Sequence, residues 1–299
     1  MECKYISCFS YKGGAGRSTL SINVVPFLAE MLNATKERPL VLVDMDIDSC
    51  GLTYLFGLDK HERLLSDSVQ GWLHPKYSQM PIVEDDDFED AVYHTMFKRL
   101  YPVGEYFGFD NDAIRCLPAN PGVALGNDSN YDAAQSNYVN EFKRMCKFFA
   151  CGVLFDSAVG NQLTANWSNR CANYILCCMR PTEQFRDGTN RFFDDYDQKA
   201  HGKKIIVIPN VVPTDALVVG DKRYPEYAKE RIVENFSDNV FRKNNTYYLN
   251  LLQGNKFGVP KIDRFMWQEG VLKLANDLTP LEKIALERYR EIAAIIAEN

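Results

Sequence analysis

A glycine-rich segment directly after an apolar run near the N-terminus is the feature that most constrains the fold of this chain. Residues 5–9 read Tyr-Ile-Ser-Cys-Phe, and residues 11–19 read Tyr-Lys-Gly-Gly-Ala-Gly-Arg-Ser-Thr. A glycine-rich turn between a strand and a helix aims backbone N–H groups into a concavity that holds phosphate, beside the positive end of the helix. The sequence therefore predicts a phosphate-binding loop, followed by a helix over about residues 17–32.

Two positions of this segment depart from the common phosphate-loop pattern G-x-x-x-x-G-K-[ST]. With Gly16 and Ser18 aligned, Tyr11 stands where the first glycine belongs and Arg17 stands where the lysine belongs. An additional cation, Lys12, precedes the glycine pair, and the Ser18 hydroxyl is available to bind Mg²⁺. The residue types of a phosphate site are present, but the cations are rearranged.

Two further apolar runs end in carboxylates. Residues 40–46 end in Asp44 and Asp46, and residues 152–160 place Asp156 after Gly-Val-Leu-Phe. Continuous apolar runs are typical of strands buried on both faces of a parallel sheet. Ligands of open α/β sheets bind at the carboxyl ends of such strands, so these carboxylates are candidates for one functional site.

These three segments, in this order, resemble the ParA/MinD family of ATPases, which belongs to the SIMIBI class of P-loop proteins. Residues 12–18 are similar to the family's deviant Walker A motif, K-G-G-x-G-[KR]-[ST]. Residues 44–52 are similar to its D-x-D-x-x-x-x-x-L element, and residues 156–160 to its Walker B motif, D-[ST]-x-x-G. The resemblance covers roughly residues 3–56, 115–211 and 257–297.

The resemblance implies an α/β fold, with a mostly parallel twisted sheet flanked by helices on both faces. Strands alternating with helices argue for the same βαβ units, with further strands expected at 173–179 and 203–210. We expect a single P-loop ATPase domain over 1–299, with insertions at about 58–112 and 214–256. Both insertions are candidate surfaces for a partner.

Two helices can be anticipated in detail. Pro26 lies well inside the first helix, where proline removes a hydrogen bond, so we expect a kink or an early break there. The last helix, about 279–297, begins with a Thr-Pro pair suited to a helix N-terminus. Its polar face carries mixed charges, so we expect it to dock on its own domain rather than to act as a membrane anchor.

The family resemblance also implies roles for individual residues. ATP would lie on a loop made of Gly13, Gly14, Ala15, Gly16, Arg17, Ser18 and Thr19. Mg²⁺ would be held by Ser18, Asp44 and Asp156, while Asp46 would position the attacking water. Lys12 would cross to the phosphates of a second protomer. Asn210, at the end of a predicted strand, would read the adenine edge, since its amide carries both a donor and an acceptor.

The implied function is an ATP-dependent homodimer that hydrolyses ATP and positions, recruits or regulates a partner protein complex. Arg17 is planar and larger than lysine, so we expect ATP binding to survive and hydrolysis to be slow. One alternative is a nucleotide-binding scaffold with little or no hydrolysis. A second is an iron–sulfur protein related to the nitrogenase iron protein, which shares the Lys-Gly-Gly loop but needs cysteines that bridge two protomers.

Composition and net charge limit the functions and the location that this chain is expected to have. The 299-residue chain carries a net charge of −6, which does not favour a broad non-specific DNA-binding face, although local basic patches could contact phosphate. Its nine cysteines contain no C-x-x-C pair and are typical of reduced thiols. We expect no signal peptide, and the sequence shows no apolar run of the roughly 18–20 residues needed to span a bilayer. We therefore expect a cytoplasmic protein.

Overall fold

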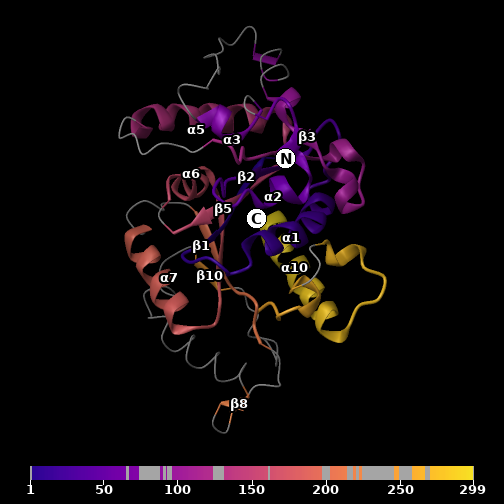
Figure 1. The fold of residues 1–299 in the computed structure, drawn as a ribbon, viewed down its shortest axis with the longest axis vertical. Helices are drawn as coiled ribbons and strands as arrows, with labels where there is room; N and C mark the ends of the chain where they lie inside the picture. Colours follow the sequence, from indigo (N-terminus) through magenta and orange to yellow (C-terminus); the bar gives the residue numbers. More distant parts are fainter. Residues whose placement is uncertain are drawn as a thin grey trace.

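A single mostly parallel sheet organises the molecule in our computed structural model (Figure 1). The model describes residues 2–64, 67–73, 88–89, 92, 96–123, 131–160, 162–196, 203–213, 218–219, 222–223, 246–248, 258–266 and 270–298. The strand order is β10-β7-β6-β1-β5-β2-β4-β3, and β3 alone pairs antiparallel with its neighbour among these strands. The strands are β1 (Lys4–Ser10), β2 (Leu40–Asp44), β3 (Tyr101–Pro102), β4 (Ile114–Leu117), β5 (Gly152–Val159), β6 (Tyr174–Met179), β7 (Lys204–Pro209) and β10 (Thr246–Tyr248).

Helices and short elements connect these strands. The α-helices are α1 (Arg17–Met31), α2 (Gly51–Leu55), α3 (Val69–Leu73), α5 (Tyr131–Phe149), α6 (Leu163–Cys171), α7 (Glu183–Tyr196) and α10 (Pro280–Ala297). The 3₁₀ turns are η1 (Leu58–Lys60), η3 (Phe97–Arg99), η4 (Gly104–Phe107), η5 (Asn111–Ala113), η6 (Asp263–Met266) and η7 (Leu272–Leu274). A separate two-stranded ribbon joins β8 (Val218–Val219) to β9 (Lys222–Arg223).

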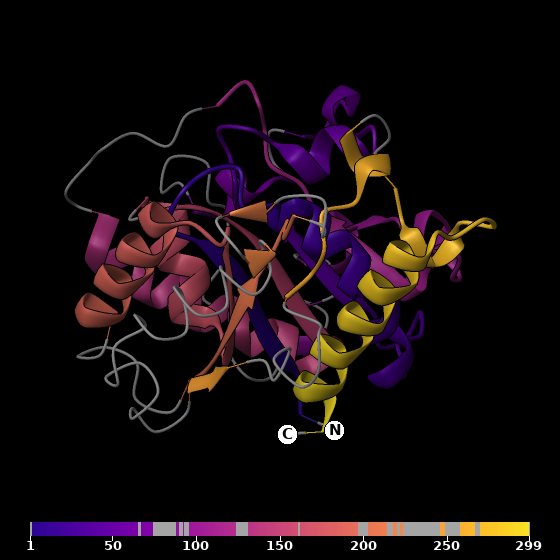
Figure 2. The ribbon, with the colours of Figure 1, turned by 90° about the horizontal axis from the view of Figure 1, so that it is seen from below.

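Helices cover both faces of the sheet, as expected. Figure 2 shows α1 and α10 on one side of the strands and α5, α6 and α7 on the other. Alternate residues of a strand point to opposite faces. Accordingly, Ile6 and Cys8 of β1 join the core beneath α1 and α10, whereas Tyr5 joins the core beneath α5 and α6. Every residue of β2 is buried, as predicted for a strand covered on both faces.

The first helix does not break at its proline. We expected a kink or an early break at Pro26; α1 runs unbroken past Pro26 to Met31, so the early break is wrong. All residues from Leu20 to Ala29 are buried, and the helix packs extensively on α10 as well as on β1 and β5. Most helical stability in proteins comes from such tertiary packing, which here outweighs the hydrogen bond that proline removes.

The last helix begins where the sequence predicted. The Thr279 side chain accepts from the Glu282 backbone N–H, and the Glu282 side chain accepts from that of Thr279, forming a capping box. Tyr289, Ile292 and Ile296 are buried in the core shared with α1. Most of the apolar stripe of α10 is therefore covered by the domain itself, although Leu281 in its first turn is exposed.

Each of the two predicted insertions contributes a strand to an edge of the sheet. The first insertion supplies the short α3, several 3₁₀ turns and β3, which pairs antiparallel with β4 at one edge of the sheet. The second insertion supplies β10, which extends the opposite edge by pairing with β7. Most of residues 214–256 and much of 58–112 lie outside the described residues.

Candidate nucleotide-binding site

The strand order brings the three predicted motifs to one place. β1 lies between β5 and β6, and β5 in turn pairs with β2. The chain therefore passes from β1 through α1 to β2, on one side of β1 in the sheet. It passes from β5 through α6 to β6, on the other side. Such a switch point at the carboxyl ends of parallel strands is where open α/β sheets bind ligands. The glycine-rich loop leaves β1 at this point.

Gly16 fixes the junction between the loop and α1. It is the N-cap residue of α1 with φ = 76°, a conformation that favours glycine, and its carbonyl accepts the Leu20 N–H at 2.9 Å. A Cβ at Gly16 would lie 2.8 Å from Nδ2 of Asn210. The junction thus requires glycine for both conformation and space, and it leaves the N-terminus of α1 as the base of the loop.

Arg17 lies on the buried side of the loop. Its guanidinium donates from Nη1 to Oγ of Ser10 at 2.6 Å and from Nη2 to Oδ2 of Asp46 at 2.8 Å. The side chains of Arg17 and Asp46 are only 9% and 14% exposed. A charged pair so little exposed is strongly coupled, because little water screens it. Arg17, which the resemblance places in the ATP-binding loop, is therefore bonded to Asp46, which it assigns to the attacking water.

Asp44 and Asp156 are register partners on adjacent strands and are almost completely buried. Thr53 donates to Oδ2 of Asp44 from its backbone N–H and its hydroxyl, at 2.9 and 2.7 Å. Ser21 donates to Oδ1 of Asp156 at 3.1 Å. The second oxygen of each carboxylate, Oδ1 of Asp44 and Oδ2 of Asp156, has no hydrogen-bond partner among the described residues.

Burial raises the pKa of both carboxylates. It raises the pKa of Asp44 to about 7, with a further increase from the negative charge of Asp156. Burial also raises the pKa of Asp156 to about 6, although the Ser18 hydroxyl and the Arg17 charge partly oppose the shift. A buried carboxylate disfavours its charged form unless a cation or a donor compensates it. One oxygen of each carboxylate, Oδ1 of Asp44 and Oδ2 of Asp156, has no such donor among the described residues.

These residues fit a magnesium ion. Mg²⁺ prefers oxygen ligands, keeps several waters and is usually bound through one or two carboxylates together with substrate phosphates. Asp44 and Asp156 offer two unsatisfied carboxylate oxygens, and Ser18, one turn before Ser21 on α1, offers a hydroxyl. Among the described residues, no cluster of three or more His, Cys, Asp or Glu side chains could hold a metal ion. The donor set therefore matches an ion that shares its shell with phosphate and water.

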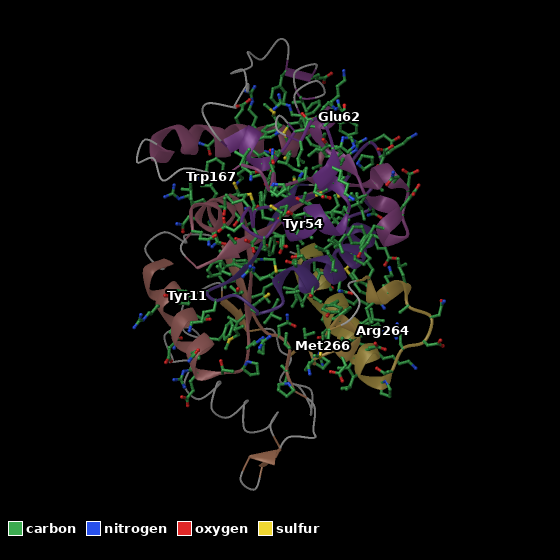
Figure 3. All side chains as sticks on the ribbon, viewed as in Figure 1. Tyr11, Tyr54, Glu62, Trp167, Arg264 and Met266 are labelled. Carbon is green, nitrogen blue, oxygen red and sulfur yellow. The ribbon has the colours of Figure 1, made fainter. Side chains whose placement is uncertain are left out.

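The opposite side of the loop is exposed and lies against α7. Figure 3 shows Tyr11 beside this helix. A Cβ at Gly188 of α7 would lie 2.1 Å from Cδ1 of Tyr11, so the tyrosine ring packs directly on the glycine. Nζ of Lys12 donates to Oε1 of Gln184 at 3.3 Å. Tyr11, which replaces the usual first glycine of the loop, thus anchors the loop to a helix.

An arginine that the sequence analysis did not single out also reaches this side. Nε of Arg180 donates to the carbonyl oxygen of Gly14 at 2.6 Å. Arg180 is exposed and lies in the turn between β6 and α7. Its only sequence signal was a basic residue before a proline. Ser10 and Thr53, which bond to predicted site residues, were also missed because small polar residues at strand and helix ends are common.

Asn210 lies against the loop from the end of β7. Its side-chain N–H groups donate to the carbonyl oxygens of Ala15 at 2.8 Å and Gly16 at 3.2 Å. The next residue, Val211, has φ = 55°, a strained conformation for a β-branched side chain that a neighbouring strand-like contact between Val212 and Pro260 helps to hold. Asn210 is thus adjacent to the loop, and its role toward adenine stays a prediction.

Most predicted site residues come together. Lys12, Arg17, Asp44, Asp46, Asp156 and Asn210 all lie at or beside the loop, although they derive from separate segments of the chain. Gly13 and Gly14 are exposed, whereas Ala15 is buried. Thr19 lies in the first turn of α1, where its carbonyl accepts from Asn23 at 2.8 Å. The roles assigned to these residues stay predictions.

No helix among the described residues is both long and apolar enough to span a bilayer. All nine cysteines are unpaired and buried. Buried thiols do not offer the surface ligands that a metal cluster shared between two protomers requires.

Comparison with solved structures identifies the fold. A plasmid partition protein from Borrelia burgdorferi B31 bound to AMPPNP matches with a TM-score of 0.60 and 14% identity, over 100% of this chain and 99% of that chain. The septum site-determining protein MinD from Pyrococcus horikoshii OT3, complexed with Mg-ADP, matches with a TM-score of 0.59 and 17% identity, over 98% and 96%. An ATP complex of a variant of McdA from Cyanothece matches with a TM-score of 0.58 and 13% identity, over 99% and 96%.

Sequence comparison gives no match, either to a family model or to a curated protein. The likeness therefore lies in the three-dimensional arrangement, and at these identities it establishes the fold. The mostly parallel sheet, the helices on both faces and the loop after β1 are those of the P-loop architecture expected from the motifs. The chain has the fold of the ParA/MinD-type ATPases.

Proposed function

We propose that this protein is a Mg²⁺-dependent ATPase whose nucleotide state controls its dimerisation and thereby positions, recruits or regulates a partner protein complex. The observation that carries the proposal is the pair of buried carboxylates, Asp44 and Asp156, which lie on neighbouring strands beside α1 and have one unsatisfied oxygen each among the described residues. A site built this way is costly without a cation, because burying an uncompensated charge is unfavourable. Mg²⁺ arriving with a nucleotide would supply that cation.

Different residues of the chain would bind the phosphates, the metal ion, the attacking water and the base. Backbone N–H groups from Gly13 to Thr19 and the N-terminus of α1 would bind the phosphates. Ser18, Asp44 and Asp156 would hold Mg²⁺, which when bound neutralises phosphate charge and polarises the phosphoryl group. Asp46 would orient the attacking water once its carboxylate no longer bonds to Arg17. Asn210 would contact the base.

Lys12 would act on a second protomer. Its side chain lies on the exposed side of the loop and, among the described residues, makes one long contact, to Gln184. A cation supplied in trans stabilises the charge of a phosphoryl-transfer transition state and is worth several orders of magnitude in rate. Dimerisation would therefore depend on ATP, and hydrolysis would reverse it.

A second candidate is a nucleotide-bound scaffold that dimerises but does not turn over. The contact between Arg17 and Asp46 favours it, because a water-positioning carboxylate already paired with an arginine is not free to accept a proton. In this case ATP binding would be the whole signal. Both candidates place the partner surface on the insertions at about 58–112 and 214–256.

The experiment is phosphate release measured together with solution mass, with and without Mg-ATP. It would compare the wild type, Lys12→Ala and the control Lys36→Ala, whose lysine is 67% exposed and pairs with the neighbouring Glu37. We expect an ATP-dependent dimer, and a loss of at least about a hundredfold in turnover for Lys12→Ala alone. Dimerisation without phosphate release would favour the scaffold. A wild type that stays monomeric with ATP would refute both candidates.

A further inference from the structure

Arg180 is an exposed cation placed against the middle of the glycine-rich loop. Its Nε donates to the Gly14 carbonyl at 2.6 Å, across 166 residues of sequence. Nη2 lies 3.8 Å from where a Cβ of Gly14 would be, so the planar guanidinium lies along the loop backbone. Within the part of the chain that the structure describes, its Nη groups make no hydrogen bond. Both Nη groups are therefore available as donors beside the predicted phosphate site.

The turn that carries Arg180 is fixed in place. Tyr11 packs on Gly188 of α7, and Lys12 contacts Gln184 one turn earlier. Within the turn, the Thr182 N–H donates to the Arg180 carbonyl at 2.8 Å. These contacts on both sides hold the start of α7 over the loop. The position of Arg180 is thus set by the fold before any ligand binds, which lowers the entropic cost of using it in binding.

The loop's own arginine is committed elsewhere. Arg17 stands where the ordinary loop has its phosphate-binding lysine, but its side chain is buried and bonded to Ser10 and Asp46. Its charge is balanced by a carboxylate, whereas Arg180 has no carboxylate partner among the described residues. A free arginine fork is suited to phosphate, which it can bind through two N–H groups.

We infer that Arg180 is a phosphate-binding residue of the nucleotide site, supplying the cation that the loop lacks at position 17. This inference rests on the proposed function, because it assumes that the loop binds a nucleotide. Arg180 would contact the phosphates of the nucleotide bound to its own protomer. Its effect would grow with phosphate charge, so ATP would depend on it more than ADP, and AMP would not depend on it.

Equilibrium binding of fluorescent N-methylanthraniloyl ATP, ADP and AMP to the full chain tests the inference. The variants are Arg180→Ala, Arg180→Lys and the control Arg191→Ala, whose arginine is also exposed but lies further along α7. We expect Arg180→Ala to weaken ATP binding about tenfold and to reduce its salt dependence, because one charged contact is lost. Lysine at this position should restore part of the affinity, and Arg191→Ala should bind as the wild type does.

The salt dependence separates a phosphate contact from a structural role. If Arg180 only supported the Gly14 carbonyl, Arg180→Ala would weaken binding without changing the salt dependence, and Arg180→Lys would not rescue it. That result would overturn the inference, as would unchanged ATP affinity in Arg180→Ala or an equal loss in Arg191→Ala. A wild type that binds no ATP would refute the proposed function and the inference together, whereas the preceding outcomes leave the proposed function standing.

Discussion

The two sides of the glycine-rich loop differ in how their charges are balanced. On the buried side, Arg17 is paired with Asp46, and Asp44 and Asp156 are almost completely buried on neighbouring strands. On the exposed side, Lys12 and Arg180 donate to neutral oxygens, with no carboxylate partner among the described residues. The carboxylates of the buried side therefore lack a balancing cation, and the cations of the exposed side lack a balancing anion. A magnesium nucleotide carries both, which explains how one ligand could complete both sides.

The difference also separates stability from binding. Removing a buried partner leaves an uncompensated charge and destabilises the fold, whereas removing an exposed cation changes affinity and leaves the fold intact. Variants on the two sides should therefore affect different measurements. The predictions below begin with the stability of the buried side and then take up the contact of the loop with α7 and the rate of hydrolysis, from the largest expected effect to the smallest.

Removing the buried arginine should have the largest effect on stability. Arg17→Ala leaves Asp46 with no cation and is expected to lower the free energy of unfolding by about 3 kcal/mol. Chemical denaturation measures this change. The control Lys36→Ala removes one member of an exposed pair and should cost less than about 0.5 kcal/mol. Equal costs for the two variants would mean that the Arg17 pair is not buried in solution.

Lowering the pH should stabilise the ligand-free protein. The folded-state pKa values of Asp44 and Asp156 are raised to about 7 and about 6 from an ordinary value of 3.8. A raised folded-state pKa means stability that is present at low pH and is lost as pH rises through the folded value. We expect a gain of roughly 2 kcal/mol between pH 8 and pH 6, measured by denaturation without metal. The Asp44→Asn variant should show a smaller gain; an unchanged gain would contradict the assignment.

Filling the contact between the loop and α7 should destabilise the protein moderately. Gly188→Ala places a methyl group 2.1 Å from Tyr11, so the ring must move, at a cost of about 1–2 kcal/mol. Gly13→Ala is the matched control, because a Cβ there meets nothing within 4 Å. Thermal unfolding of both variants checks this comparison. If Gly188→Ala is as stable as Gly13→Ala, then Tyr11 does not anchor the loop.

Restoring the common loop residue should have the smallest effect. Lysine at position 17 keeps the charge but cannot bond to Ser10 and Asp46 with the same planar fork, so Asp46 would be released more readily. We expect Arg17→Lys to raise the rate of ATP hydrolysis about threefold, a difference of about 0.7 kcal/mol in barrier height. A slower rate in this variant would show that Arg17 assists hydrolysis instead of restraining it.

The sequence predicted the centre of the molecule better than its edges. The runs that became β1, β2 and β5 are continuous and apolar because both faces of these strands are covered. The edge strands β3 and β10 are two and three residues long and lie within insertions, so they leave almost no periodic signal. The expected break at Pro26 failed because local preference did not reveal how deeply α1 is buried.

The candidate site was predictable to a similar degree. The motifs predicted that the loop, Asp44 and Asp156 lie close together, because the carboxyl ends of parallel strands share one edge of the sheet. It did not reveal that Arg17 bonds to Asp46, because a bond between side chains 29 residues apart depends on tertiary geometry. Arg180 was missed for the same reason, since its contact with Gly14 spans 166 residues.

The most direct test of the account is calorimetric titration of ATP into the wild type and Asp156→Asn, with Mg²⁺ and with a chelator. The account predicts that Mg²⁺ strengthens ATP binding to the wild type by about tenfold or more, and that Asp156→Asn loses this gain but binds metal-free ATP at least as well. The exposed control Asp48→Asn should keep the gain. A wild type that binds ATP equally with and without Mg²⁺, or not at all, would contradict the claim that the buried carboxylates await a magnesium nucleotide.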